Sequence, residues 1–419
     1  MKYNPPIIVG AGIAGLSSAL ALAHKGIKSI VIEKRKKIDT AGAGIQVTPN
    51  ATRILAHWGI LDRLIKAGIQ PHFLQLRDGT SLKTHLQIDL IECYEKRWKF
   101  PYLTIHRADL QKILYETAIE HPLITCKIGE AFISSKKATI NGASVIEIQT
   151  VNSTQKQQYQ PYTTSLLIGC DGVWSKLRQL TPFCEKADFS GLIAWRATIS
   201  SNNLSQNVYP LLQSTKTITA WLGSNNHLVI YPIQPEKTFN IVAITYGENS
   251  EKKWNLKGEK NELKSLFSKW NPKILQLIDH IDDWRYWPLF QMKQDRFLGL
   301  ENQVFVGDCA HAALPFAAQG SSMAIEDAAT LAETISASNL SLQRAVSLYE
   351  KIRRPRIAAI KKQVNFNKLV YHASGPLAIA RNFMMKIRTA ENIISDLDWL
   401  YTYDAINLTK SYITQTNKR

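Results

Sequence analysis

The stretch PIIVGAGIAGLSSALALAHKGIKSIVIE, residues 6–33, decides the fold class of this chain. Residues 6–10 form an apolar run that predicts a short buried strand, and residues 28–33 predict a second one. Small and apolar residues over 13–25 predict a helix between the two strands. Two strands joined by a crossover helix indicate a parallel sheet.

A glycine fingerprint lies at the junction between the first strand and the helix. Gly10 allows a tight turn, Gly12 lets a pyrophosphate approach the backbone, and Gly15 lets the helix pack close to the strand. The N-terminus of the helix presents free N–H groups to the phosphates. Glu33 ends the second strand, where an acidic residue is expected to hold an adenosine ribose. We assign these four residues and Ala14 to a dinucleotide site for FAD or NAD.

The composition fits a globular protein with two domains or one large composite domain. The chain has 419 residues, of which 45% are hydrophobic and 20% charged. Its formal net charge of +17 would attract polyanions such as FAD and NAD(P)H, although a lysine-rich solvated surface explains it equally well. Basic runs occur at 34–37 and 353–356. We find no zinc-finger spacing, RNA-binding aromatic motif or basic zipper, so nucleic-acid binding is not expected.

The cysteines and the hydropathy pattern indicate a cytoplasmic protein without a membrane span. An odd number of cysteines, none spaced C-x-x-C, argues against a disulfide framework, a metal site or a dithiol redox centre. They are Cys93, Cys126, Cys170, Cys184 and Cys309. No uninterrupted apolar stretch reaches about 18 residues, the minimum for a spanning helix.

The rest of the chain mixes strand-like and helical patterns. Helices are expected at 50–66, 107–120, 259–281 and 321–336. Strands are expected at 69–90, 130–170, 187–250 and 304–307, with turns at Asp78-Gly79 and Asn141-Gly142. Beyond Ser341 the chain is mostly helical and basic. There Pro355 is expected to break or start a helix, and Gly375-Pro376 to separate two others.

Two further motifs follow apolar strands. GCDGVWSKLR at 169–178 places Asp171 in a tight turn before a helix that begins near Ser175. GDCAHAALPFAAQGSSMAIED at 307–327 begins with Gly307-Asp308. With the glycine fingerprint, and in this order, the motifs resemble those of the FAD-dependent aromatic hydroxylases. These are single-component flavoprotein monooxygenases with a para-hydroxybenzoate hydroxylase-like fold, and the resemblance runs from residue 6 to about 360.

The resemblance implies that the three motifs hold one FAD. Asp308 would accept hydrogen bonds from the ribityl hydroxyls, and Asp171 belongs to a motif associated with both FAD and NAD(P)H. The helix beginning at Gly320, Ser321 and Ser322 would face the N1–C2=O edge of the flavin. That edge becomes negative on reduction, so the positive end of a helix stabilises it.

Two shorter segments resemble other parts of the family's FAD site. AGIQVTPN at 43–50 resembles the loop that lines the isoalloxazine ring, where Gly44 and Ile45 would allow close backbone contact. HRADL at 106–110 resembles a helix start whose arginine contacts FAD, and Arg107 is the matching residue. A surface ion pair is the alternative role for Arg107.

The resemblance also implies the reaction, a hydroxylation through a flavin C4a-hydroperoxide formed from reduced FAD and O2. The best candidate base is His227 in HLVIYP, which resembles the salicylate and 3-hydroxybenzoate hydroxylase branch. Tyr231, four residues along the strand, would share its face. Alternatively, His227 is a buried histidine without a catalytic part.

Three further residues have candidate roles beside the flavin. Gln319 matches a glutamine that hydrogen-bonds substrate, although it would equally well brace its loop. Pro315 resembles the proline whose carbonyl lies beside the flavin at the oxygenation site. Arg196 would assist the flavin or a substrate anion, or form a structural ion pair.

These patterns predict an α/β protein with a Rossmann-like FAD-binding domain, an inserted β-sheet substrate domain and a helical C-terminal region. The FAD-binding domain is expected at 1–72, 103–185 and 285–340, the substrate domain at 73–102 and 186–284, and the helical region at 341–419. The expected co-substrates are NADH or NADPH, O2 and a small aromatic compound. A monomer or a homodimer is expected.

Two alternatives stay open at this level. A quinone-pathway hydroxylase of the same flavin family would work at a membrane surface, which the basic tail after residue 341 would contact weakly. A flavin-binding sensor would bind the same cofactor without turnover. Pelleting with membranes tests the first, and phenol-stimulated NADH and O2 consumption tests the second.

Overall fold

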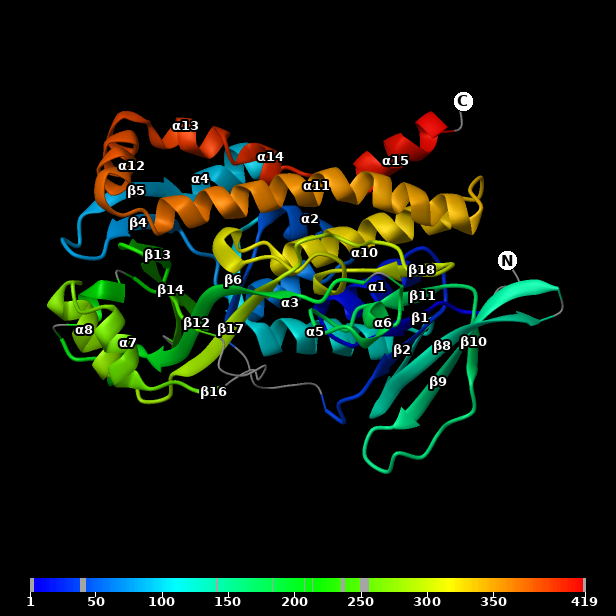
Figure 1. The fold of residues 1–419 in the computed structure, drawn as a ribbon. Coiled ribbons are helices and arrows are strands. Elements are labelled where there is room, and N and C mark those ends of the chain that lie inside the picture. Colours follow the sequence, from blue (N-terminus) through cyan, green and yellow to red (C-terminus); the bar gives the residue numbers. More distant parts are fainter. Residues whose placement is uncertain are drawn as a thin grey trace.

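Figure 1 shows a computed structural model of the chain, which describes residues 4–37, 43–140, 142–182, 184–206, 208–212, 214–234, 238–248 and 256–416. A small parallel sheet with helices lies on one side of the molecule and a large sheet on the other (Figure 1). A long C-terminal helix crosses both (Figure 1). The predicted combination of a parallel α/β unit, a second sheet and a helical C-terminal region is confirmed.

The parallel sheet has five strands in the order β18-β11-β1-β2-β7. Its strands are β1 (Ile7–Val9), β2 (Ser29–Glu33), β7 (Ile124–Ile128), β11 (Leu167–Gly169) and β18 (Gln303–Phe305). The apolar residues of β1, β11 and β18 are all buried, as expected for a parallel sheet covered by helices. The covering helices include α1 (Ile13–Ala23), α5 (Arg107–Glu120) and α10 (Gly320–Ser336).

The large sheet has eight strands in the order β16-β17-β12-β15-β14-β13-β4-β5. Its strands are β4 (Phe73–Asp78), β5 (Thr84–Asp89), β12 (Asp188–Ser200), β13 (Thr217–Leu222), β14 (Asn226–Gln234), β15 (Thr238–Tyr246), β16 (Leu256–Lys257) and β17 (Arg285–Gln291). Because β17 pairs with β12, this sheet continues past residue 284. The domain boundaries themselves stay a prediction.

The two faces of the large sheet have different neighbours because side chains alternate along each strand. One face, which includes Trp195, Leu228 and Ile241, forms a hydrophobic core of its own with helices α7 (Lys260–Leu266) and α8 (Pro272–Asp279). The other face, which includes Tyr231 and Ile244, joins the core of the parallel-sheet unit. This second face therefore looks toward the predicted cofactor loops.

Smaller elements connect the two sheets. A three-stranded antiparallel sheet of β8 (Glu130–Ile140), β9 (Ala143–Asn152) and β10 (Tyr162–Thr164) lies at the far end of the molecule (Figure 1). A two-stranded ribbon joins β3 (Gly44–Val47) to β6 (Leu103–His106). The short helical elements are α4 (Leu90–Glu92), η1 (Cys93–Trp98), α6 (Lys176–Gln179), η2 (Ser201–Asn203), η3 (Tyr209–Leu212), α9 (Asp308–His311) and η4 (Pro315–Ala317).

Two predicted helices are each divided in the structure. The helix expected at 50–66 is α2 (Pro49–His57) and α3 (Leu61–Ala67), because the chain turns at Gly59 with φ of 72°. The helix expected at 259–281 ends with α7 at Leu266 and restarts as α8, whose first residue is Pro272. Asn271 caps α8 by accepting a hydrogen bond from the Lys273 N–H. The predicted turn at 141–142 lies partly outside the described residues.

The C-terminal region consists of α11 (Leu342–Tyr371), α12 (Gly375–Ile387), α13 (Ala390–Ser395), α14 (Asp398–Tyr401) and α15 (Ala405–Thr416). The expectation that Pro355 breaks or starts a helix is wrong, since α11 continues through it. Arg353 and Arg356, on either side of the proline, form buried ion pairs with α10. These tertiary contacts offset the roughly 3 kcal/mol that an internal proline costs. No helix in the described part of the chain combines the length and apolarity needed to cross a membrane.

Candidate active site

The predicted cofactor motifs meet at one edge of the parallel sheet. Gly10 directly follows β1, and Glu33 is the last residue of β2. Asp171 lies two residues after β11, and Gly307 lies two residues after β18. The strands are parallel neighbours, so their carboxyl ends lie along the same edge. In open α/β sheets this edge is the usual place for a bound dinucleotide.

The three fingerprint glycines differ in what surrounds them. Gly10 has φ of +107°, and a Cβ there would lie 2.6 Å from the Cys170 carbonyl oxygen. A Cβ on Gly15 would lie 1.8 Å from the Gly10 carbonyl oxygen, so the helix and the strand could not approach. A Cβ on Gly12 would meet no atom within 4 Å. The fold therefore requires Gly10 and Gly15, whereas Gly12 lies beside the open space that a pyrophosphate would fill.

Glu33 holds the glycine loop from the neighbouring strand. Its Oε2 accepts a hydrogen bond of 2.8 Å from the Ala11 N–H, and its Oε1 accepts one of 2.8 Å from the Arg35 N–H. Each carboxylate oxygen has a second lone pair, so Glu33 retains acceptors for ribose hydroxyls. Gln111 of α5 donates from Nε2 to the Ala11 carbonyl at 2.7 Å, which ties α5 to the same loop.

The Gly307-Asp308 turn is wedged between two helices. A Cβ on Gly307 would lie 3.1 Å from the Cβ atoms of both Ala14 in α1 and Ala324 in α10. The Asp308 side chain is exposed, yet protein atoms surround it and this desolvation raises the pKa of its carboxyl. Solvent reaches this carboxyl although protein atoms surround it, so the carboxyl lies in a recess. Asp308 is thus placed to accept hydrogen bonds from a ligand seated there.

Asp171 has one oxygen engaged and one free of hydrogen bonds. Its Oδ2 accepts from the N–H groups of Lys176 and Leu177, at 2.7 and 3.2 Å. Its Oδ1 is buried without a hydrogen-bond partner. Ser175 caps the following helix by accepting from the Arg178 N–H at 2.9 Å. A buried carboxylate oxygen without a donor fits a site that a polar ligand completes.

Arg107 lies between the cofactor loops and the large sheet. It begins α5, its N–H donates to the Ala43 carbonyl at 3.1 Å, and its charge acts on both Asp308 and Arg196. The neighbouring ribbon pairs Gly44 with His106 and Ile45 with Ile105.

The reason for glycine at position 44 differs from the sequence expectation. The Gly44 N–H donates to Asn240 Oδ1 at 2.6 Å, and a Cβ there would lie 2.6 Å from Ile233 Cγ2. Asn240 and Ile233 belong to the large sheet, on β15 and β14. Close packing against that sheet therefore requires a glycine here, and the expected contact of this loop with the flavin ring stays a prediction.

Side-chain hydrogen bonds hold the N-terminus of α10, whereas its first residue, Gly320, borders open space. A Cβ on Gly320 would meet no atom within 4 Å. Ser321 Oγ donates to the Gln46 carbonyl at 3.3 Å, and Ser322 Oγ lies 2.7 Å from Thr48 Oγ1. Both serines therefore tie α10 to the ribbon, and the N–H groups of the helix begin beside open space at Gly320.

Gln319 uses both ends of its side chain within the protein. Its Nε2 donates to Thr48 Oγ1 at 3.1 Å, and its Oε1 accepts from Asn50 Nδ2 at 3.1 Å. The side chain is buried. This geometry favours the bracing role over a hydrogen bond to substrate.

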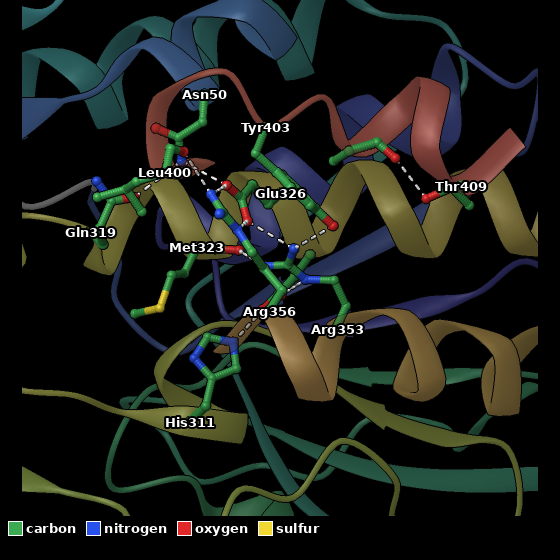
Figure 2. A network of polar contacts seen from close by, with 12 residues as sticks. Asn50, His311, Gln319, Met323, Glu326, Arg353, Arg356, Leu400, Tyr403 and Thr409 are labelled. Atoms are coloured by element: carbon green, nitrogen blue, oxygen red, sulfur yellow. Dashed lines mark hydrogen bonds and ion pairs between the residues drawn. The ribbon is translucent and has the colours of Figure 1, made fainter. Parts of the chain in front are cut away.

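A buried ion-pair network supports the back of these loops, and Figure 2 labels Glu326, Arg353, Arg356 and His311 in it. Glu326 and Asp327 of α10 pair with Arg353 and Arg356 of α11 over distances of 2.7–2.8 Å. Asp327 Oδ2 also accepts from the Gly307 N–H at 2.8 Å and contacts His311 Nε2 at 2.6 Å. We call Glu326, Asp327, Arg353, Arg356 and His311 the ion-pair network.

The ion-pair network is buried, and His311 Nδ1 is the one side-chain nitrogen or oxygen in it without a hydrogen-bond partner. Glu326, Asp327 and Arg353 have side chains with 0% exposure. Nearby positive charge lowers the pKa of Asp327 to about 2 against the opposing effect of burial. Asn50 Nδ2 donates to Glu326 Oε1 at 2.6 Å, which links the network to the segment 43–50 that is expected to line the flavin ring. Two residues of the basic run at 353–356, Arg353 and Arg356, are therefore buried.

The candidate substrate residues share one face of the large sheet. His227 and Tyr231 are four residues apart on β14, and Arg196 lies in register with Val242 of β15, which lies in register with Val229 of β14. The charge of Arg196 interacts with Tyr231. Arg196 packs over the Trp287 ring at 5.0 Å, and its Nε is buried without a hydrogen-bond partner.

His227 contacts a second buried histidine that the sequence did not reveal. Its Nδ1 lies 2.7 Å from Nε2 of His372, which follows α11. Phe316 packs against both rings, at centroid distances of 5.1 and 5.3 Å. Pro315, next to Phe316, is exposed at the start of the loop that leads to Gln319. We call His227 and His372 the histidine pair.

Burial keeps the histidine pair neutral. Desolvation lowers the pKa of His227 well below 6.5, and it lowers the pKa of His372 to about 4. A 2.7 Å contact between two neutral rings needs one N–H donor and one lone pair. If His227 donates through Nδ1–H, its Nε2 holds a lone pair that can accept a proton.

Comparison with known proteins agrees with this arrangement. Residues 4–364 match the family described as FAD binding domain. The chain is 29% identical over 407 residues to 3-hydroxybenzoate 6-hydroxylase of Klebsiella oxytoca, covering 97% of this chain and 98% of that protein. It is 26% identical over 419 residues to 6-hydroxynicotinate 3-monooxygenase of Pseudomonas fluorescens, covering 97% of each.

Solved structures share the fold. Klebsiella pneumoniae HpxO complexed with FAD and uric acid superposes with a TM-score of 0.79 at 22% identity, over 95% of this chain and 96% of that chain. A salicylate hydroxylase substrate complex gives a TM-score of 0.79 at 17% identity over 98% of each chain. Because the family match spans most of the chain and its glycine, Asp-Gly and Gly-Asp loops converge at one sheet edge, the chain belongs to the FAD-binding domain family.

Proposed function

We propose that this chain is an FAD-dependent monooxygenase that hydroxylates a phenolic or aromatic acid, with NADH or NADPH as reductant and O2 as oxidant. The observation that carries the proposal is that the cofactor loops lie opposite one face of the large sheet. The loops at the carboxyl edge of the parallel sheet face a sheet surface that carries the half-buried Arg196, a buried tyrosine and a neutral, buried histidine. Such convergent polar groups in an apolar surrounding are typical of a small-molecule site.

The cofactor would be held by residues from every converging loop. The N-terminus of α1 and Gly12 would bind the pyrophosphate, Glu33 the adenosine ribose, and Asp308 the ribityl chain. Arg107 and Asp171 would contact the cofactor from their neighbouring loops. The N-terminus of α10 at Gly320 would place its positive end near the flavin ring. FAD supplies the reduction by NAD(P)H and the activation of O2.

The sheet surface would orient the aromatic acid. Arg196 remains cationic in spite of a pKa lowered by burial, and its unsatisfied Nε offers a donor for a carboxylate. His227 would accept the phenol proton at Nε2, which raises the electron density of the ring. Its contact with His372 gives that proton a path away from the substrate. Tyr231 would line the same face, and the Pro315 carbonyl would lie at the flavin.

The names of the relatives support a phenolic or related acid as substrate. The relative from Klebsiella oxytoca is a 3-hydroxybenzoate 6-hydroxylase, and one structural neighbour is a salicylate hydroxylase. The proposal also includes a cytoplasmic location and a monomer or homodimer. The relatives' names favour neither a quinone-pathway hydroxylase nor a sensor without turnover.

The test is a screen of phenolic acids with the purified protein. We expect a yellow protein whose NAD(P)H oxidation is stimulated by one phenolic acid, with equal O2 uptake and a product heavier by one oxygen atom. Oxidation that releases only hydrogen peroxide, or no stimulation by any acid although FAD is bound, would contradict the hydroxylase and support a sensor.

A further inference from the structure

Helix α12 (Gly375–Ile387) presents its apolar side to solvent. Ile379, Phe383 and Ile387 are 73%, 61% and 58% exposed, and they recur at the four-residue spacing of one helix face. The opposite face carries Arg381, which donates from Nη1 to the Val370 carbonyl at 3.1 Å. A surface helix normally buries its apolar side. Figure 1 shows α12 at the edge of the molecule, joined to α11 by a short turn.

Helix α11 also carries exposed apolar residues close in the chain to α12. Phe366 and Leu369, near the end of that helix, are 58% and 57% exposed. Leu377 and Met384 of α12 are also exposed. Isolated exposed apolar residues are common, but a group of this size on two consecutive helices indicates an interaction surface. We call Phe366, Leu369, Leu377, Ile379, Phe383, Met384 and Ile387 the apolar patch.

The sequence around the apolar patch is entirely basic in its charged residues. Residues 351–390 contain ten lysines and arginines and no aspartate or glutamate. Arg353 and Arg356 are buried in the ion-pair network, and Arg354, Lys361 and Arg388 form ion pairs with Glu350, Asp295 and Asp396. Lys362 and Lys386 are exposed on the two helices that carry the patch. An apolar helix face with exposed lysines is the pattern of helices that lie in the interface of anionic membranes.

We propose that the apolar patch docks this protein on the surface of an anionic lipid bilayer, with α12 lying parallel to the membrane plane. Apolar side chains of α12 enter the headgroup region, and the lysines contact lipid phosphates. The charge pattern favours a bilayer over a second copy of the chain. In a twofold dimer the same patch lies on both sides of the interface, so the two basic segments would face each other.

The experiment is sedimentation of the full-length, flavin-loaded protein with large vesicles at low ionic strength. We expect binding to vesicles of phosphatidylcholine with phosphatidylglycerol, and binding at least about tenfold weaker to phosphatidylcholine alone. Salt at about 0.5 M should release much of the bound protein because it screens the lysines. The double variant Ile379→Ser with Phe383→Ser should lose binding to both kinds of vesicle.

Matched variants separate the apolar and the electrostatic contributions. Lys362→Glu with Lys386→Glu should weaken binding to anionic vesicles about tenfold or more. Ile140→Ser and Lys66→Glu, which change exposed residues on β8 and α3, should leave binding unchanged. Retained flavin absorbance and an unchanged melting temperature check that each variant is folded.

Two outcomes would overturn the proposal. One is equal, weak sedimentation with and without anionic vesicles. The other is a concentration-dependent dimer by light scattering that Phe383→Ser dissociates, because the patch would then bind a second copy. Hydroxylase activity is measured separately in detergent-free buffer without vesicles, so failure of membrane binding and failure of the proposed function are distinguishable.

Discussion

The ion-pair network and the histidine pair are both buried and ionisable, but they differ in how completely they are satisfied. Every side-chain nitrogen and oxygen of Glu326, Asp327, Arg353 and Arg356 has a partner, and only Nδ1 of the fifth member, His311, has none. On the other side of the loops, His372 Nδ1 and Arg196 Nε are buried without hydrogen-bond partners. The first region therefore fixes the positions of the loops. The second keeps spare donors and acceptors, which substrate and proton transfer require.

Replacing His227 tests the functional side of this comparison and has the largest expected effect. The variant His227→Asn should lower kcat/KM for the phenolic substrate by about 10²- to 10⁴-fold, the usual contribution of a general base. FAD content should stay near one per chain because the histidine pair does not hold the cofactor loops. The exposed His280→Asn serves as control. A variant that loses flavin in proportion to activity would assign His227 a structural role.

Replacing Arg353 tests the structural side. The variant Arg353→Met removes a buried cation from Glu326 and Asp327, which keep only Arg356 and His311, and this should lower the free energy of unfolding by about 3–5 kcal/mol. Arg354→Met, which changes a neighbouring residue that is 53% exposed, should alter it by less than about 0.5 kcal/mol. Urea denaturation measures both, and equal small effects would contradict the assigned role of the ion-pair network.

The two regions should respond to acid in separate pH ranges. The pKa of His372 falls from 6.5 to about 4 in the folded protein, so the unfolded chain binds more protons between these values. Stability should therefore decrease as the pH falls through this range, by at most about 3 kcal/mol. The pKa of Asp327 falls from 3.8 to about 2, so its contribution is lost only below pH 4.

The variant His372→Asn checks this separation. Its stability should depend less on pH than that of the wild type between pH 6.5 and 4, with the steep loss below pH 4 retained. Chemical denaturation at several pH values supplies the curves. Parallel curves for the two proteins above pH 4 would show that His372 is not desolvated in the folded state.

Replacing Gln319 has the smallest expected effect. It tests whether this residue belongs with the groups that hold the loops or with those that contact the substrate. The variant Gln319→Leu removes one hydrogen bond each from Asn50 and Thr48, which keep Glu326 and Ser322 as partners, at a cost of about 1–3 kcal/mol of stability. FAD affinity should decrease while KM for the aromatic acid changes little. A large increase in KM with unchanged FAD affinity would instead place the Gln319 amide on the substrate.

The local sequence predicted the loops better than it predicted the contacts between distant elements. Strand, glycine turn and helix at 6–33 follow from spacing, and each cofactor motif lies where its strand ends. Pro355 within a continuous helix was not predictable, because Arg353 and Arg356 reach carboxylates some thirty residues away. The partner of His227 also comes from 145 residues further along the chain. No local pattern marks His372, and only the order of strands in the large sheet and the end of α11 bring the pair together.

The most direct test of the account compares flavin binding by two glycine variants. Gly12→Ala adds a methyl group into open space beside the pyrophosphate position, so the protein should keep its melting temperature without FAD and bind FAD at least about tenfold more weakly. Gly15→Ala forces its Cβ to within 1.8 Å of a backbone oxygen and should fail to fold. A colourless wild-type protein that takes up no FAD, or a Gly12→Ala variant with unchanged FAD affinity, would contradict the proposed cradle.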